Sequence, residues 1–234
     1  MTLYKSLKEE CFEANMMLPK LGLVLFTFGN VSAVSRENAV FAIKPSGVPY
    51  EILKMEDIVI MDYDAKVVEG KMRPSSDTKT HAQLYKYWND IGGITHTHST
   101  YAVAWAQAGF DIPIFGTTHA DHTHRDIPCA KVLTDEMIRG DYEFETGNQI
   151  FDCFAEKQLS HHEVEMVLLQ NHGPFTWGKN AEKSVYNAAV LEEIARMAYL
   201  TLQINPNTER IKDSLRLKHF ERKHGENAYY GQGC

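Results

Sequence analysis

The sequence predicts a single domain that contains both helices and strands. Its 234 residues, of which 44% are hydrophobic and 24% charged, suffice for one substantial core. Apolar residues recur in successive segments with either helical or strand-like spacing. Neither an internal repeat nor a linker rich in proline, glycine or serine separates these segments. We therefore expect residues 1–234 to form one domain.

The N-terminal part of the chain combines one helix with several short strands. Apolar groups at helical spacing predict a helix over 3–18, which Pro19 ends. Runs of apolar and β-branched residues predict strands over 22–28, 31–34, 39–43, 57–61 and 66–69. A helix follows over 78–88, after the polar stretch Pro74-Ser75-Ser76-Asp77.

The remaining part of the chain is richer in helices. Two glycines lead into a short strand that holds His96 and His98, and an extended segment is expected over 112–115, before a polar loop at 116–121. The run over 164–169, which is apolar except for Glu165, predicts a buried strand. Helical spacing predicts helices over 99–108, 134–139, 146–154, 180–204 and 208–224, the last of them strongly basic.

Net charge and cysteine usage restrict the class of protein. A formal net charge of -7 gives no electrostatic reason to expect nucleic acid as a partner. No apolar stretch is long enough to cross a bilayer, so no membrane partner is expected, and the N-terminus lacks the apolar run of a signal peptide. The four cysteines have neither metal-ligand nor redox spacing. We expect reduced thiols in a cytoplasmic protein.

Three histidines and one carboxylate form a candidate site for a divalent metal. Side chains alternate along a strand, so His96 and His98 would point the same way with Cα atoms roughly 6.6 Å apart. Two polar residues on the solvated face of an edge strand would show the same pattern. His172 follows the strand over 164–169 and precedes Gly-Pro, which suits a ligand at the rim of a sheet. With Asp77, the set offers the donors that Zn²⁺ and similar ions accept.

Three loops carry residues that suit a phosphate group. Ser46-Gly47 ends a strand beside Lys44, and Ser75-Ser76 stands before the helix over 78–88. Gly29-Asn30 is either a plain turn or a turn whose backbone approaches a ligand closely. Ordinary turn chemistry explains Ser46-Gly47 equally well, and helix capping would account for Ser76 or Asp77. A metal beside a phosphate pocket suggests a small phosphorylated metabolite as the substrate.

These motifs resemble those of the class II aldolase/adducin family and, within it, of its L-ribulose-5-phosphate 4-epimerases. The resemblance covers essentially the whole chain in order. Its segments are Gly29–Ser32, Lys44–Val48, Pro74–Asp77, Gly92–Ser99, Gly116–Asp121, His172–Lys179, Lys218–Phe220, Arg222–Gly225 and Ala228–Gln232.

The resemblance implies an α/β fold with three αβα layers around a central, mainly antiparallel sheet, assembled into a homotetramer with active sites between subunits. It makes Asp77, His96, His98 and His172 the metal ligands, for zinc first and manganese or cobalt as alternatives. It assigns substrate binding to Gly29, Asn30, Ser46, Gly47, Ser75 and Ser76. The acid/base pair would be Asp121 and Tyr230, because the tail over 226–234 would complete a neighbouring subunit's site.

The activity so implied is the interconversion of L-ribulose 5-phosphate and D-xylulose 5-phosphate through cleavage and re-addition at C3–C4. The family's aldolases carry Glu after the Ser-Ser pair, and the shorter Asp77 favours an epimerase over a sugar-phosphate aldolase. A non-catalytic scaffold like the adducin head and a Schiff-base aldolase using Lys44 are further alternatives. His122 and His124 depart from the family pattern as a local variation of the pocket or as an accessory metal site. His161-His162 is expected only to solvate its loop.

Overall fold

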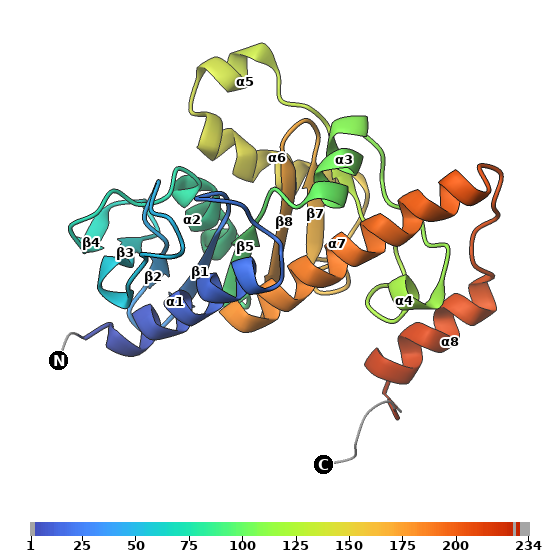
Figure 1. The fold of residues 1–234 in the computed structure, drawn as a ribbon, viewed down its shortest axis with the longest axis horizontal. Helices are drawn as coiled ribbons and strands as arrows, with labels where there is room; N and C mark the ends of the chain where they lie inside the picture. The colour runs from blue at the N-terminus through green and yellow to red at the C-terminus, as the bar shows by residue number, and fades with distance from the viewer. Residues whose placement is uncertain (1–2, 227, 230–234) are drawn as a thin grey trace.

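A computed structural model of the chain describes residues 3–226 and 228–229. Within these residues, eight strands form one sheet in the order β4-β3-β2-β1-β5-β8-β7-β6 (Figure 1). Every neighbouring pair is antiparallel except β6 with β7. The strands are β1 Asn30–Ser35, β2 Val40–Ile43, β3 Val59–Asp62, β4 Val67–Glu69, β5 Gly93–His96, β6 Cys129–Ala130, β7 Met166–Leu169 and β8 Gly173–Gly178.

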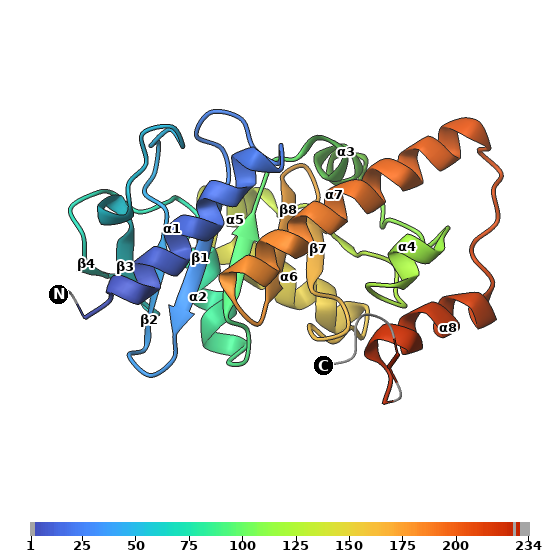
Figure 2. The same ribbon diagram turned by 60° about the horizontal axis from the view of Figure 1, so that its bottom comes forward.

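Helices cover both faces of this sheet. Figure 2 shows α1 and α7 crossing one face, while α2 and α6 pack against each other on the opposite face. The helices are α1 Lys5–Lys20, α2 Thr78–Tyr87, α3 Thr100–Ala108, α4 Thr117–Ala120, α5 Asp135–Arg139, α6 Tyr142–Glu156, α7 Ala181–Ile204 and α8 Asp213–His224, with a 3₁₀ turn η1 at Met55–Asp57. The predicted three-layer fold with a mainly antiparallel sheet is confirmed.

The central strands are buried on both faces because each face meets a helical layer. Along β2, Val40 and Ala42 belong to the apolar cluster that includes α1, while Phe41 and Ile43 belong to the cluster that includes α2 and α6. This alternation follows from the two-residue period of a strand. Burial on both faces explains why β2 reads as a continuous apolar run in the sequence. Among the described residues, no helix combines the length and apolar character needed to span a membrane.

Several sequence predictions differ from the structure. The segment over 22–28 is not a strand: the chain leaves α1 through Gly22, whose φ of 67° reverses its direction, and Phe26 is 76% exposed. The helix predicted to end before Pro19 runs to Lys20, with the proline in its last turn. The polar loop at 116–121 contains the short helix α4.

Strands β6 and β8 were not predicted. The first has two residues, and the second begins with Gly173 and Pro174, two residue types that weaken a strand pattern. Nevertheless β8 lies between β5 and β7 in the sheet.

Candidate functional site

One cleft gathers all ten residues predicted to bind metal or substrate. Its volume is about 380 Å³, and it is formed by the loops before β1, after β2 and before α2, together with the end of β5, the segment before β8 and the start of α6. The predicted residues that line it are Gly29, Asn30, Ser46, Gly47, Ser75, Ser76, Asp77, His96, His98 and His172. The structure thus confirms that these residues lie together, while their individual roles remain predictions.

The three histidines converge at one point of the cleft. The Nε2 atoms of His96 and His98 lie 3.0 Å apart, and the ring centres of His96 and His172 are 4.7 Å apart. One potential ligand atom from each of the three lies within 4.8 Å of the others. The prediction that His96 and His98 share one strand face is wrong in detail, because β5 ends at His96. The rings nevertheless meet after the chain has left the strand.

The protonation of this cluster fits a metal ion. His96 Nδ1 lies 2.9 Å from the Pro174 carbonyl oxygen, which can only accept, so Nδ1 donates and the ring turns Nε2 toward His98 Nε2 at 3.0 Å. Burial, followed by the proximity of His96, lowers the pKa of His172 to about 3. The same two causes lower the pKa of His98. A lowered pKa keeps the rings of His98 and His172 neutral, which is the form that binds a divalent cation.

Asp77 lines the same cleft as the histidines and does not cap α2, but the group of potential ligand atoms within 4.8 Å of one another contains the three histidines without it. It occupies the N-cap position, but its side chain makes no capping hydrogen bond. Instead Oδ2 accepts a hydrogen bond from Asn30 Nδ2 at 2.6 Å. Burial would raise the pKa of this carboxyl, yet His96, His81 and the Asn30 hydrogen bond together hold it below its usual value. The capping interpretation of Asp77 therefore fails, and a carboxylate beside the histidines remains.

Strand pairing explains how Gly29 and Asn30 reach the cluster. The register between β1 and β5 pairs Asn30 with His96. Gly29 precedes this pair with a φ of +70°, and a Cβ built on it would stand 2.8 Å from the His96 carbonyl oxygen. A side chain would collide there, so glycine permits the close approach of the two segments.

The two serine loops are joined side by side. The backbone N–H of Ser46 donates to the Arg73 carbonyl at 2.9 Å, and that of Ser75 donates to the Lys44 carbonyl at 3.0 Å. Lys44 itself is buried, and its Nζ donates to the Val48 carbonyl at 2.8 Å. Burial lowers the pKa of Lys44 to about 8. The cleft is thus also lined by two hydroxyl-bearing loops and by the buried Lys44.

Asp121 lies elsewhere in the chain's own fold. It ends α4, which contacts α8, and both lie together at the end of the molecule beyond α7 (Figures 1 and 2). Its carboxylate accepts hydrogen bonds from His219 Nδ1 and Arg222 at 2.9 Å, and Lys223 Nζ lies at 3.5 Å. These contacts hold its pKa below the usual value although burial acts to raise it. Tyr230 lies outside the described residues.

The second His-x-His pair does not form a comparable cluster. His122 faces Tyr186, with ring centres 5.8 Å apart, and His124 faces Phe220 at 4.5 Å. Within residues 3–226 and 228–229, neither belongs to a group of three potential metal ligands. This arrangement favours local variation over an accessory metal site.

Tyr142 and Glu143 are among the residues of the cleft that sequence reasoning missed, and they lie far from its motifs in the sequence. Both stand at the start of α6, which was predicted to begin at 146. The hydroxyl of Tyr142 is 3.4 Å from His172 Nδ1, so this side chain closes the cluster from the helical layer. The apolar spacing that predicts α6 begins after them and therefore carried no signal for either residue.

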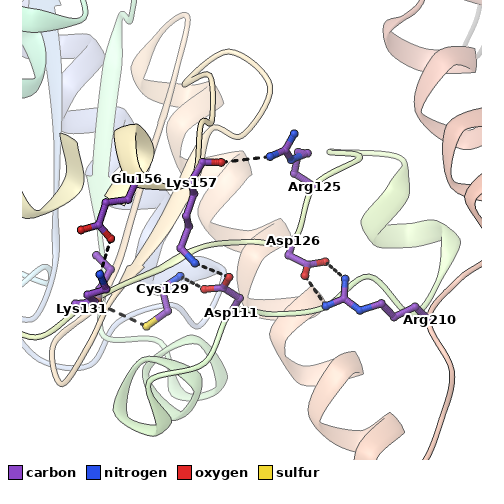
Figure 3. Close-up of polar contacts among 9 residues, drawn as sticks. Asp111, Arg125, Asp126, Cys129, Lys131, Glu156, Lys157 and Arg210 are labelled. Atoms are coloured by element: carbon purple, nitrogen blue, oxygen red, sulfur yellow. Dashed lines mark hydrogen bonds and ion pairs between the residues drawn. The ribbon is translucent and has the colours of Figure 1, made fainter. Parts of the chain in front are cut away.

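A larger cavity of about 660 Å³ lies between the α8 region and the edge of the sheet. Most of its charged side chains are paired: Arg210 binds both oxygens of Asp126, and Lys157 Nζ lies 2.7 Å from Asp111 (Figure 3). Asp111 also accepts the backbone N–H of Cys129 at 2.7 Å. These contacts join separate segments and leave the histidine cleft as the better candidate for chemistry.

Comparison with known proteins gives consistent results. A model of the Class II Aldolase and Adducin N-terminal domain matches residues 9–199. A relative named L-ribulose-5-phosphate 4-epimerase UlaF, from Salmonella paratyphi A (strain ATCC 9150 / SARB42), is 53% identical over 228 residues, covering 97% of this chain and 99% of its own.

Two solved structures resemble the fold. An L-fuculose 1-phosphate aldolase matches with a TM-score of 0.74 at 26% identity, covering 93% of this chain and 95% of its own. The L-fuculose 1-phosphate aldolase from Glaciozyma antarctica PI12 matches with a TM-score of 0.76 at 19% identity, covering 96% and 84%. The second likeness concerns the fold alone.

Proposed function

The chain belongs to the class II aldolase and adducin family, and on that premise we propose that it is a metal-dependent L-ribulose-5-phosphate 4-epimerase. It would interconvert L-ribulose 5-phosphate and D-xylulose 5-phosphate, the activity named for relatives of nearly full length at 53% identity. The observation that carries the proposal is the cleft, where three histidines and Asp77 face two serine loops. Such a cleft offers a cation site at one end and an anion site at the other.

We assign Asp77, His96, His98 and His172 as ligands of a divalent cation. Three imidazoles and one carboxylate suit Zn²⁺, with Mn²⁺ or Co²⁺ as alternatives. The hydrogen bond from His96 Nδ1 to Pro174 supports this role, because it fixes the ring with Nε2 toward the cluster. Asn30 supports it from the other side by orienting the Asp77 carboxylate.

The serine loops would bind the phosphate of the substrate. The hydroxyls of Ser46, Ser75 and Ser76 and the amide of Gly47 are the donors that we assign to its oxygens. Asn30 donates to Ser75 Oγ at 3.1 Å, which leaves the hydroxyl hydrogen of Ser75 to point into the cleft. Gly29 completes the wall of the cleft, because a residue without a side chain lets its backbone lie close to the His96 carbonyl oxygen.

C4 of the substrate lies β to its ketone, so its hydrogen is not acidified, and inversion there requires the C3–C4 bond to break and re-form. A bound divalent cation would supply the Lewis acid that stabilises the negative charge left on the C2 and C3 oxygens. The serine loops would retain the phosphorylated two-carbon fragment while its aldehyde turns the other face.

One residue must accept the proton of the C4 hydroxyl and another must return a proton on the opposite face. We assign these roles to Asp121 and Tyr230 of a neighbouring subunit in a homotetramer. In support, Asp121 is not among the described residues that line the cleft of its own chain.

Co-refolding of Asp77→Asn with Tyr230→Phe subunits should restore activity that each variant lacks. Recovery requires sites built from an intact metal set and a neighbour's tyrosine; hybrids without recovery would refute the shared site.

The direct test is incubation of the metal-free protein with L-ribulose 5-phosphate, before and after addition of Zn²⁺ or Mn²⁺, followed by ¹³C NMR. Formation of D-xylulose 5-phosphate only with metal supports the epimerase. Accumulation of dihydroxyacetone and glycolaldehyde phosphate would instead identify an aldolase. Metal binding without any turnover of this sugar would overturn the assignment of the substrate.

A further inference from the structure

A second group of metal-binding side chains lies away from the cleft. It consists of Asp90, in the loop between α2 and β5, and of His161 and His162, in the loop between α6 and β7. Each loop enters a strand whose other end leads to the cleft, since His96 ends β5 and His172 follows β7. The two groups therefore lie at opposite ends of the same two strands.

Both histidines turn the same ring atom to one carboxylate. His161 Nε2 lies 2.9 Å from Asp90 Oδ1, and His162 Nε2 lies 2.8 Å from Asp90 Oδ2. One potential ligand atom from each of the three side chains lies within 4.8 Å of the others. Solvation of a loop does not require two neighbouring histidines to share one aspartate from a distant part of the chain.

His161 is held rigidly, whereas its partners can adjust. Its ring stacks on Trp88 with an interplanar angle of 5° and ring centres 4.7 Å apart. Its carbonyl accepts a hydrogen bond from Trp177 Nε1 at 2.8 Å. The side chains of His162 and Asp90 are 65% and 40% exposed, against 20% for His161. One preorganised ligand with two mobile ones at the surface is an arrangement that an ion from solution can complete.

We propose that Asp90, His161 and His162 bind a second divalent transition-metal ion of the zinc class. Two imidazoles and one carboxylate select Zn²⁺, Ni²⁺ or Cu²⁺ over Mg²⁺ or Ca²⁺, which prefer all-oxygen sites. Tetrahedral ligands at about 2.1 Å from a metal are roughly 3.4 Å apart. The separations of 2.8 and 2.9 Å must therefore open by about 0.5 Å, which the exposed His162 and Asp90 permit.

The proposed role of this site is to connect two loops, and it takes no part in the chemistry of the cleft. A bound ion would link the loop before β5 to the loop before β7, and so stabilise the folded chain against unfolding. The inference does not rest on the proposed epimerase activity, because it depends only on the three side chains and their separation from the cleft.

The test is the number of Zn²⁺ ions bound per chain of the intact protein, measured by isothermal titration after removal of metal with a chelator. We expect two ions for the native chain and one for His162→Gln and for Asp90→Asn. Glu163→Gln, which removes an exposed charge beside His162, is the matched control and should retain two. Loss of a direct ligand should weaken the second site by more than the roughly 10–100-fold typical of outer-shell changes.

A second readout uses the stacked tryptophan. Cu²⁺ bound at His161 would quench the fluorescence of Trp88, and the quenching should disappear in His162→Gln but persist in His98→Asn. One ion in the native chain, lost in His98→Asn and retained in His162→Gln, would overturn this inference and leave the cleft site standing. One ion lost only in His162→Gln would support it and refute the metal set of the cleft. Two ions retained in His162→Gln would also overturn it.

Discussion

Gly29 and Gly47 form a matched pair for testing how the cleft is built. Both have φ of +70°, but a Cβ on Gly29 would lie 2.8 Å from the His96 carbonyl oxygen and 2.9 Å from Val24 Cγ1. A Cβ on Gly47 would meet nothing within 4 Å. Gly29→Ala and Gly47→Ala therefore share the cost of a left-handed backbone, and only Gly29→Ala adds a collision with the backbone of a metal-ligand candidate.

The magnitudes follow from these contacts. An L-residue in the left-handed region costs about 1–2 kcal/mol, and overpacking a filled site costs about 1–3 kcal/mol more. Alanine also restricts the unfolded chain by about 0.4–1 kcal/mol, which offsets part of the loss equally in both variants. The free energy of unfolding should thus fall by about 1–3 kcal/mol more in Gly29→Ala than in Gly47→Ala.

Urea unfolding of the metal-free proteins measures this difference, and chelator competition measures their affinity for Zn²⁺. We expect Gly29→Ala to bind Zn²⁺ more weakly, because the collision displaces the His96 backbone, and Gly47→Ala to bind it like the native chain. Equal losses of stability in the two variants, or native metal affinity in Gly29→Ala, would refute the argument that close approach at Gly29 positions His96.

Further predictions concern the ligands, the phosphate loops and Lys44. His98→Asn should lose tightly bound Zn²⁺ from the cleft and nearly all activity; full activity after exhaustive chelation would exclude the metal role. Ser75→Ala and Ser76→Ala should each raise KM for the sugar phosphate by up to about 1.5–3 kcal/mol in binding free energy, whereas a fall in kcat at unchanged KM would contradict phosphate binding. Burial lowers the pKa of Lys44 from 10.5 to about 8, so between these pH values the unfolded chain holds the proton that the folded chain has lost. The free energy of unfolding should therefore rise with pH across this window. Urea unfolding of Lys44→Met should show a smaller rise than that of the native chain, and equal pH dependences of the two proteins would contradict the role of Lys44.

The cleft was predictable because its candidate metal and substrate ligands lie in short sequence motifs at the ends of neighbouring strands and helices. Antiparallel pairing of β1 with β5 sets Asn30 opposite His96, so two motifs 66 positions apart meet through one register. Each motif had a plausible structural explanation on its own. For Asp77 the structure excludes capping, because its side chain accepts a hydrogen bond from Asn30 and makes no capping hydrogen bond to α2.

What the sequence could not supply are contacts that depend on the tertiary fold. Tyr142 reaches His172 only because α6 begins earlier than its apolar spacing indicates and packs against α2. The residues of 22–28 have strand-like composition, but the positive φ angles of Gly22 and Phe26 interrupt an extended conformation. Likewise, no local pattern links Asp90 with His161, because their pairing spans 71 positions.

Asp121 and Tyr230 are candidate acid/base residues that only the family resemblance could identify. The contacts of Asp121 connect it to α8, the helix that precedes Tyr230 in the sequence. In the described residues α8 has no buried side chain, and Asp121 ties it to α4 through contacts along its length. His219 and Arg222 bind the carboxylate, and His224, the last residue of α8, donates from Nε2 to the Asp121 carbonyl at 2.9 Å.

Tyr230 follows the end of α8 by six positions in the sequence, and the last residue of α8, His224, is bound to the Asp121 carbonyl. Loss of activity in Asp121→Asn would consequently mix the loss of a proton-transfer group with the release of α8 and its tail. Tyr230→Phe removes only a hydroxyl and keeps Asp121, His219 and Arg222 unchanged, which is why the subunit-mixing experiment relies on the tyrosine.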